Sequence, residues 1–186
     1  MNDTNPIDFN DRPGTVTSPA SVRLERLLPG TAERVWSYLT ESDLREQWLA
    51  AGRIDLHVGG EVEHVFRNNG LTAGDDAPPA RYAGVADRYV LRRRVPECDP
   101  PRVLAYTWGE ESGSPSEVRF ELVPRGEAVL LVITHSRLSS RDGMLSVSAG
   151  WHTHVAILLA RLEGEAPPAF WRTFSRLEAE YDRRIG

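Results

Sequence analysis

The feature that most constrains the fold is a broad apolar stripe that follows a long run of strand-like segments. Between Ser148 and Gly164, large apolar side chains recur at helical spacing: Trp151, Val155, Leu158, Leu159 and Leu162. This spacing is typical of one face of an amphipathic helix. Ser148 is the predicted N-cap, and Gly164 predicts the end of the helix. A helix of this kind buries its stripe against another element, here the strands that precede it.

Those preceding segments have the two-residue period of β-strands. Strands are predicted at 21–27, 53–58, 61–67, within 81–98, and at 103–109, 117–124 and 128–137. Thr31 is the predicted N-cap of a short helix, and a second short helix is predicted from Ser42 to Trp48. Consecutive strands joined by short turns indicate an antiparallel sheet. The predicted class is therefore α+β, with a curved sheet of about six or seven strands around the long helix.

We expect three parts along the 186 residues. Residues 1–20 are polar, have no apolar run and predict a flexible lead-in and not a signal peptide. Residues 21–164 predict the folded domain, and 165–186 a helical extension. The extension carries one apolar face, made by Phe170, Trp171, Phe174, Leu177 and Tyr181. That face either packs on the domain as a lid or forms a homodimer contact, because it is too apolar to leave in water.

Composition excludes several functions. The net charge of -5 argues against nonspecific nucleic-acid binding, and no stretch approaches the ~18 apolar residues of a membrane span. All 22 basic residues are arginine, which excludes Schiff-base chemistry by a lysine. Cys98 is the single cysteine, which fits a cytoplasmic location. No nucleotide-binding or nucleophile motif occurs, so no cofactor is expected.

A series of short stretches then occurs in a familiar order. They are Glu33-Arg34-Val35-Trp36, Gln47-Trp48, Val58-Gly59-Gly60-Glu61, Asp99-Pro100-Pro101-Arg102, Tyr106-Thr107-Trp108, Val118-Arg119-Phe120-Glu121-Leu122, Thr134-His135-Ser136 and Gly150-Trp151. With these stretches the chain resembles, from about Ser21 to Gly164, the bacterial homologues of the activator of the ninety-kilodalton heat-shock chaperone's ATPase. That family belongs to the START-like superfamily, also called SRPBCC.

The resemblance implies a helix-grip fold, in which the sheet curls around the long helix and can leave a cavity between them. It also implies a hydrophobic ligand: an aromatic metabolite or a lipid. Two alternatives stay open. One is a polyketide cyclase- or hydrolase-like enzyme, and the other is an interaction protein associated with a chaperone. Fold alone does not decide between them, and a noncatalytic binding protein is the favoured interpretation.

Strand alternation predicts which side chains face the long helix. The expected cavity lining is Tyr106, Trp108, Phe120, Leu131, Ile133, His135, Trp151, Val155, Leu158 and Leu162. The same side chains would equally describe a filled core. The sequence therefore indicates where to look for a pocket without deciding whether one exists.

His135 is the most interesting titratable residue of that set. Burial favours a neutral imidazole, which could anchor a ligand or act as a general base together with Tyr106. The alternative is a core histidine with satisfied hydrogen bonds, which is the favoured interpretation. No metal site is predicted, because His152 and His154 point about 200° apart on a helix and the pair His57 and His64 has no third ligand nearby in the sequence.

Overall fold

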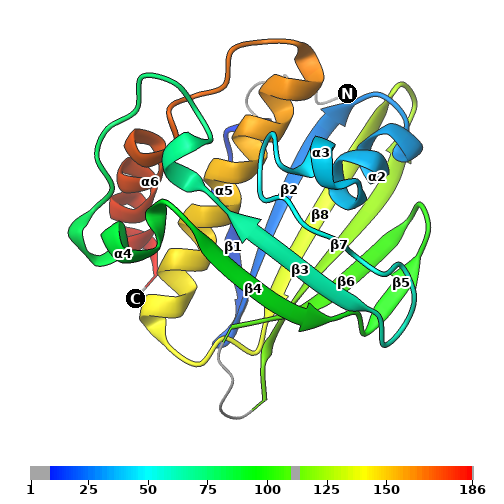
Figure 1. Ribbon diagram of the computed structural model, residues 1–186, viewed down its shortest axis with the longest axis horizontal. Helices are drawn as coiled ribbons and strands as arrows, with labels where there is room; N and C mark the ends of the chain where they lie inside the picture. The colour runs from blue at the N-terminus through cyan, green and yellow to red at the C-terminus, as the bar shows by residue number, and fades with distance from the viewer. Residues whose placement is uncertain (1–8, 110–113, 186) are drawn as a thin grey trace, which may run out of the picture.

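The computed structural model describes residues 9–109 and 114–185, and it contains a six-stranded antiparallel sheet with the strand order β1-β2-β8-β7-β6-β5 (Figure 1). The strands are β1 Thr15–Ser18, β2 Ser21–Pro29, β5 Glu97–Asp99, β6 Val103–Trp108, β7 Ser116–Arg125 and β8 Ala128–Ser136. The long helix α5, Arg141–Glu163, lies between this sheet and the last helix α6, Phe170–Arg184. The predicted α+β class, with an antiparallel sheet and a long C-terminal helix, is confirmed.

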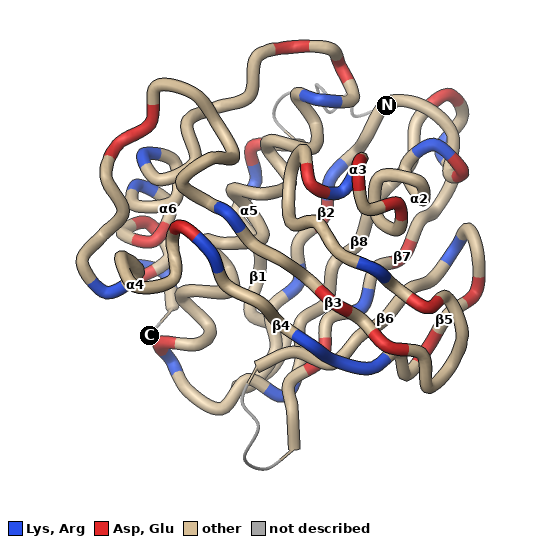
Figure 2. The backbone as a smooth tube through the Cα atoms, in the orientation of Figure 1, with Lys and Arg blue, Asp and Glu red and all other residues tan. Residues whose placement is uncertain are grey.

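A second, two-stranded sheet extends the curve of the first. It pairs β3, Glu61–Phe66, with β4, Tyr89–Arg94. The backbone N–H of Arg94 donates to Thr107 Oγ1 on β6 at 3.2 Å, which joins the two sheets. Figure 2 shows acidic residues on β3 beside basic residues on β4. The exposed arginines of β4 form cross-strand ion pairs, Arg92 with Glu63 at 2.6 Å and Arg94 with Glu61 at 3.2 Å, so they belong to a solvated strand face.

The alternation of the central strands sets the core. In β7 and β8 every second side chain is buried, and the register pairs Phe120 with Ile133 and Val118 with His135. The turn between these strands contains Gly126 with φ 65°, a left-handed conformation that favours glycine. The six strand residues of the predicted lining lie on the inner side of the fold, because the two-residue period of a strand fixes its buried face. The other four belong to α5, where helical spacing places them on its buried face.

The short helices after β2 follow from their caps. Thr31 accepts a hydrogen bond from the backbone N–H of Arg34 and starts α2, Ala32–Thr40. The second helix α3, Ser42–Arg45, follows directly. The buried guanidinium of Arg45 donates to the carbonyls of Thr40 and Gly52, so it fixes the C-terminal end of α2 and the chain that leads to β3.

Three local expectations differ from the structure. The helix α5 starts with Ser140 as N-cap, whose Oγ accepts from Gly143 N at 3.0 Å, so the predicted N-cap Ser148 lies inside the helix. Residues 53–58 form no strand, and a single isolated bridge joins Ile54 to Val62 of β3. A short helical segment, η2 Ala80–Tyr82 and α4 Ala83–Ala86, replaces the first part of the strand-like region 81–98. In each case tertiary contacts outweigh local propensity.

The two ends of the chain also pack against the domain. Within the expected lead-in 1–20, β1 pairs with β2, while residues 1–8 of that lead-in lie outside the described residues. The aromatic face of α6 is buried against its own chain, with Phe170, Trp171 and Phe174 at most 4% exposed. This arrangement matches the lid alternative, and the face is not available for the homodimer contact.

Across the residues that the structure describes, no helix is both long and apolar enough to cross a membrane.

Candidate functional site

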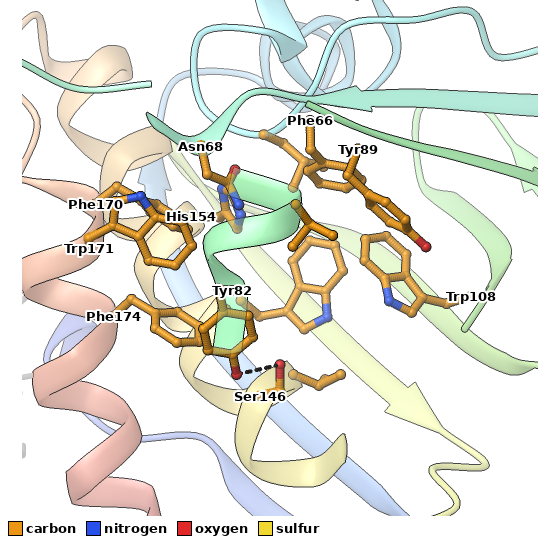
Figure 3. Close-up of a pocket in the computed structure, with 15 residues that line it drawn as sticks. Phe66, Asn68, Tyr82, Tyr89, Trp108, Ser146, His154, Phe170, Trp171 and Phe174 are labelled. Atoms are coloured by element: carbon orange, nitrogen blue, oxygen red, sulfur yellow. Dashed lines mark hydrogen bonds between the residues drawn. The ribbon is translucent and has the colours of Figure 1, made fainter. Parts of the chain in front are cut away.

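A pocket of about 230 Å³ opens between β3, α5, α6 and the segment that contains α4 (Figure 3). Fifteen residues line it: Leu49, Phe66, Asn68, Tyr82, Val85, Tyr89, Trp108, Ser146, Val147, Gly150, Trp151, His154, Phe170, Trp171 and Phe174. In the close-up the α6 side chains Phe170, Trp171 and Phe174 form one wall, and Phe66, Tyr89 and Trp108 form the opposite wall. The pocket is mostly apolar with a few polar groups, which is the usual composition of a small-molecule site.

The helix α5 contributes one side of the pocket because its residues recur at intervals of three and four. Ser146, Gly150 and His154 follow one another at four-residue spacing. Gly150 is the position that keeps the space open, since a Cβ atom built there meets no atom within 4 Å. A glycine within a helix lowers its stability, and here it leaves room that a larger side chain would occupy.

The segment that contains Tyr82 is tied to both C-terminal helices. The Tyr82 hydroxyl lies 2.9 Å from Glu178 Oε1 on α6 and 3.2 Å from Ser146 Oγ on α5. Arg81 forms an ion pair with the same carboxylate of Glu178. These contacts fix residues 80–82 over the pocket, while Val85 and Tyr89, both 43% exposed, lie where the pocket meets solvent.

The loop before this segment fixes the start of α6. Thr72 Oγ1 accepts from the backbone N–H of Phe170 at 2.9 Å, and Asp75 Oδ2 accepts from that of Trp171 at 2.8 Å. Asn69 Oδ1 accepts from the indole N–H of Trp171 at 2.7 Å. The first turn of α6 has unpaired N–H groups that require acceptors, and the loop supplies them. The aromatic wall of the pocket is thereby positioned by polar contacts outside it.

Two of the ten predicted lining residues, Trp108 and Trp151, do line this pocket, and their ring centroids are 5.3 Å apart. The other eight are buried in the packed core and do not line it: Tyr106, Phe120, Leu131, Ile133, His135, Val155, Leu158 and Leu162. Strand alternation correctly predicts which side chains face the inside of the fold. The pocket lies at the end of that inner face nearest α6, and most of the residues that enclose it lie outside the strands used for the prediction.

His135 lies in a closed hydrogen-bond chain. The indole N–H of Trp151 donates to Nδ1 at 3.1 Å, so the proton of the neutral ring is on Nε2, which donates to Ser116 Oγ at 2.9 Å. Ser116 in turn donates to the carbonyl of Trp108 at 3.0 Å. Burial lowers the pKa of His135 to about 3. Both nitrogens are occupied, and neither His135 nor Tyr106 lines the pocket, so this geometry gives no support to the general-base alternative.

Several site residues were not among those predicted from strand alternation. Asn68, Tyr82 and His154 line the pocket, together with the three aromatic side chains of α6. The aromatic spacing of α6 was the available signal, because it predicted an apolar face that either covers the domain or forms a homodimer contact. His154 is buried, and its Nδ1 lies 2.7 Å from the carbonyl oxygen of Trp48. Burial lowers the pKa of His154 to about 4, so this ring is neutral at pH 7.

The remaining histidines do not gather into a metal site. His57 is exposed, whereas His64 is buried beside Tyr106, with ring centroids 4.9 Å apart. Burial holds the pKa of His64 well below its usual value. In the described ranges 9–109 and 114–185, no three His, Cys, Asp or Glu side chains are placed to hold a metal ion.

An antiparallel sheet curved around a long C-terminal helix, with a pocket beside that helix, defines a helix-grip protein of the START-like class. The family model described as "Activator of Hsp90 ATPase homolog 1-like protein" matches residues 29–163, and the chain belongs to this family. Proteins of this family generally bind hydrophobic ligands. A search of the curated proteins finds no match.

Solved structures support the same assignment. A Bordetella parapertussis protein solved by solution NMR is 46% identical, with 95% of this chain and 92% of that chain covered and a TM-score of 0.79. CalU16 from Micromonospora echinospora is 21% identical over 94% of this chain and 96% of that chain, with a TM-score of 0.66. DynU16, from the dynemicin biosynthetic locus, is 21% identical over 81% of this chain and 49% of that chain, with a TM-score of 0.61. The last two likenesses concern the fold alone.

Proposed function

We propose that this protein binds a small apolar compound with an aromatic ring in the pocket between α5, α6 and residues 80–89. The observation that carries the proposal is the cavity of about 230 Å³, in which eight of the fifteen lining residues are Phe, Tyr or Trp. The pocket meets solvent beside Val85 and Tyr89, so a small molecule can reach it. A concave site lined mostly by apolar and aromatic side chains with a few polar groups is the usual setting for a small-molecule ligand.

The size of the pocket sets the size of the ligand. An engineered apolar cavity of about 150 Å³ binds benzene, so about 230 Å³ has room for a two-ring compound such as naphthalene. Ring faces on both walls, for example Trp171 and Trp108, favour stacked or edge-on contacts with a flat ligand. The contacts of a long-chain lipid would extend beyond this space. We therefore favour an aromatic metabolite over a lipid.

The indole N–H signals of the five tryptophans provide a direct test. Trp108, Trp151 and Trp171 line the pocket, whereas Trp36 and Trp48 do not. Titration of the ¹⁵N-labelled protein with naphthalene is expected to shift the first three signals in a saturable way and to leave the other two in place. Absence of any saturable shift, or equal shifts of all five signals, contradicts the proposal.

A chaperone-associated role stays a prediction, as does the cytoplasmic location. No ligand is stated for the Bordetella parapertussis protein or for CalU16, so the proposed ligand class rests on the pocket of this chain alone.

A further inference from the structure

The pocket wall carries a buried hydrogen-bond acceptor that has no donor. Asn68 lines the pocket, and its Oδ1 atom is buried without a hydrogen-bond partner in the structure. A buried amide oxygen without a partner loses its hydration without gaining a hydrogen bond, which destabilises the folded protein. Groups of this kind are uncommon in folded proteins and call for an explanation. A ligand with an N–H or O–H group at this position would supply the missing donor.

His154 provides a second acceptor on the same wall. The oxygen of Trp48 can only accept, so His154 Nδ1, 2.7 Å away, carries the ring proton. Its Nε2 is then a lone-pair acceptor, because the ring is neutral. Among the described residues, none makes a hydrogen bond to this Nε2 atom. Asn68 Oδ1 and His154 Nε2 are therefore two acceptors of the lining that receive no donor from the described residues.

Several other polar groups of the lining are already engaged. Ser146 Oγ lies 3.2 Å from the Tyr82 hydroxyl, which also reaches Glu178. The indole N–H groups of Trp151 and Trp171 donate to His135 and Asn69. Other donors of the lining, such as the indole N–H of Trp108 and the hydroxyl of Tyr89, make no hydrogen bond to the described residues. Among the described lining residues, however, the side-chain atom that is both buried and unpaired is an acceptor, Asn68 Oδ1.

The lining also favours uncharged ligands over ionised ones. None of the fifteen lining residues, all of them in the described part of the chain, is Arg, Asp or Glu, and the chain has no lysine. An ionised ligand would lose its hydration without meeting a charged partner, which disfavours its binding. Carboxylates, phosphates and ammonium compounds are therefore poor ligands for this pocket.

We propose that the pocket is specific for uncharged aromatic compounds that carry a hydrogen-bond donor, such as a phenolic hydroxyl, and that Asn68 determines this preference. The inference rests on the proposed function, since it specifies the ligand of the same pocket. It differs from that function in what it excludes: aromatic acids, and neutral rings that offer an acceptor only.

Four matched probes test the preference at pH 7.5: naphthalene, 2-naphthol, 2-methoxynaphthalene and 2-naphthoate. Dissociation constants come from the Trp108, Trp151 and Trp171 signals. A single neutral hydrogen bond corresponds to about a three- to tenfold change in affinity. We expect 2-naphthol to bind about three- to tenfold more tightly than naphthalene or the methyl ether, and 2-naphthoate to bind more weakly than naphthalene.

The variants Asn68→Leu and Ser146→Ala assign the preference to a residue. Asn68→Leu is expected to lose the preference, so that its dissociation constants for 2-naphthol and naphthalene become similar. Ser146→Ala removes another polar atom from the lining and is expected to keep the preference, because Ser146 is already paired with Tyr82. The wild-type probe series tests the ligand class even if a variant does not fold.

The outcomes separate the two proposals. If naphthalene binds but 2-naphthol binds no more tightly, or the methyl ether or the carboxylate binds best, the donor preference is wrong and the proposed function stands. Retention of the preference in Asn68→Leu overturns the role of Asn68. If no probe binds, both proposals fail.

Discussion

The neutral imidazole of His135 couples the stability of the fold to pH. Burial lowers its folded pKa to about 3, whereas an unfolded histidine titrates near 6.5. Between these values the unfolded chain takes up a proton that the folded protein does not. The contribution is complete above pH 6.5 and is lost as the pH falls toward 3. At pH 5 the loss is about 2 kcal/mol for one such histidine.

His135→Gln tests this coupling, because an amide can still accept from Trp151 and donate to Ser116 without titrating. The drop in unfolding free energy between pH 8 and pH 5, measured by urea denaturation, is expected to shrink by about 2 kcal/mol. The matched control is His57→Gln, which changes an exposed histidine and should leave that drop as it is. An unchanged drop in the His135 variant contradicts the assignment.

The same residue shows what sequence reasoning can reach at this scale. The alternation of β8 places His135 on the inner face, as observed. Its partners Ser116 and Trp151 lie on β7 and α5, and only the packing of these elements brings them together. Asn68 lies in a stretch without periodicity, so no pattern could place its side chain on the pocket wall. The side chains of an inner face can be predicted from the two-residue period of a strand. The hydrogen-bond partners of a buried polar group depend on how distant elements pack together.

At the scale of elements, the two ends of α5 differ in how well the sequence predicts them. The C-terminal end was predictable because Gly164 adopts φ 74°, a conformation that glycine tolerates. The N-terminal end was not, because Ser140 and Ser148 are both chemically suitable caps. Met144 and Leu145 are buried and extend the helix toward its N-terminus, which places the start at Arg141. Burial of apolar side chains therefore decided between two equivalent local signals.

Paired serine substitutions check this helix start. Ser140→Ala removes the acceptor for Gly143 N and is expected to cost about 1 kcal/mol of stability. Ser148→Ala removes a buried hydroxyl without a partner and is expected to be neutral or slightly stabilising. Urea denaturation of both variants at pH 8 gives the comparison. A larger loss for Ser148→Ala than for Ser140→Ala would show that the helix starts at the later serine.

At the scale of the whole molecule, the sheet and the long helix followed from the sequence, but the place of the pocket did not. Strand and helix periods define the curved sheet and its buried face. The pocket forms where α6 and residues 80–89 close over one end of that face, and their contacts join positions about a hundred residues apart, such as Tyr82 with Glu178. The periodicity of a short stretch of sequence does not indicate which distant residues come into contact.

Gly150 affects both the free volume of the pocket and the stability of the protein. Gly150 faces the pocket from α5, and a Cβ there meets nothing within 4 Å. Gly150→Ala adds helix propensity alone, so it is expected to stabilise the protein by about 1 kcal/mol and to retain naphthalene binding. Gly150→Leu adds apolar burial inside the pocket. It should stabilise the ligand-free protein by at least as much and abolish naphthalene binding, because the side chain occupies the space that the ligand needs.

Thermal unfolding with and without naphthalene distinguishes these effects. A ligand that binds only the folded state raises the melting temperature in proportion to the logarithm of its concentration over its dissociation constant. The parent protein and Gly150→Ala are expected to show this rise, whereas Gly150→Leu should start from a higher melting temperature and show none. If Gly150→Leu still responds to naphthalene, the ligand binds elsewhere. If it is less stable than the parent, the space beside α5 is smaller than the structure indicates, and the glycine then serves close packing instead of ligand binding.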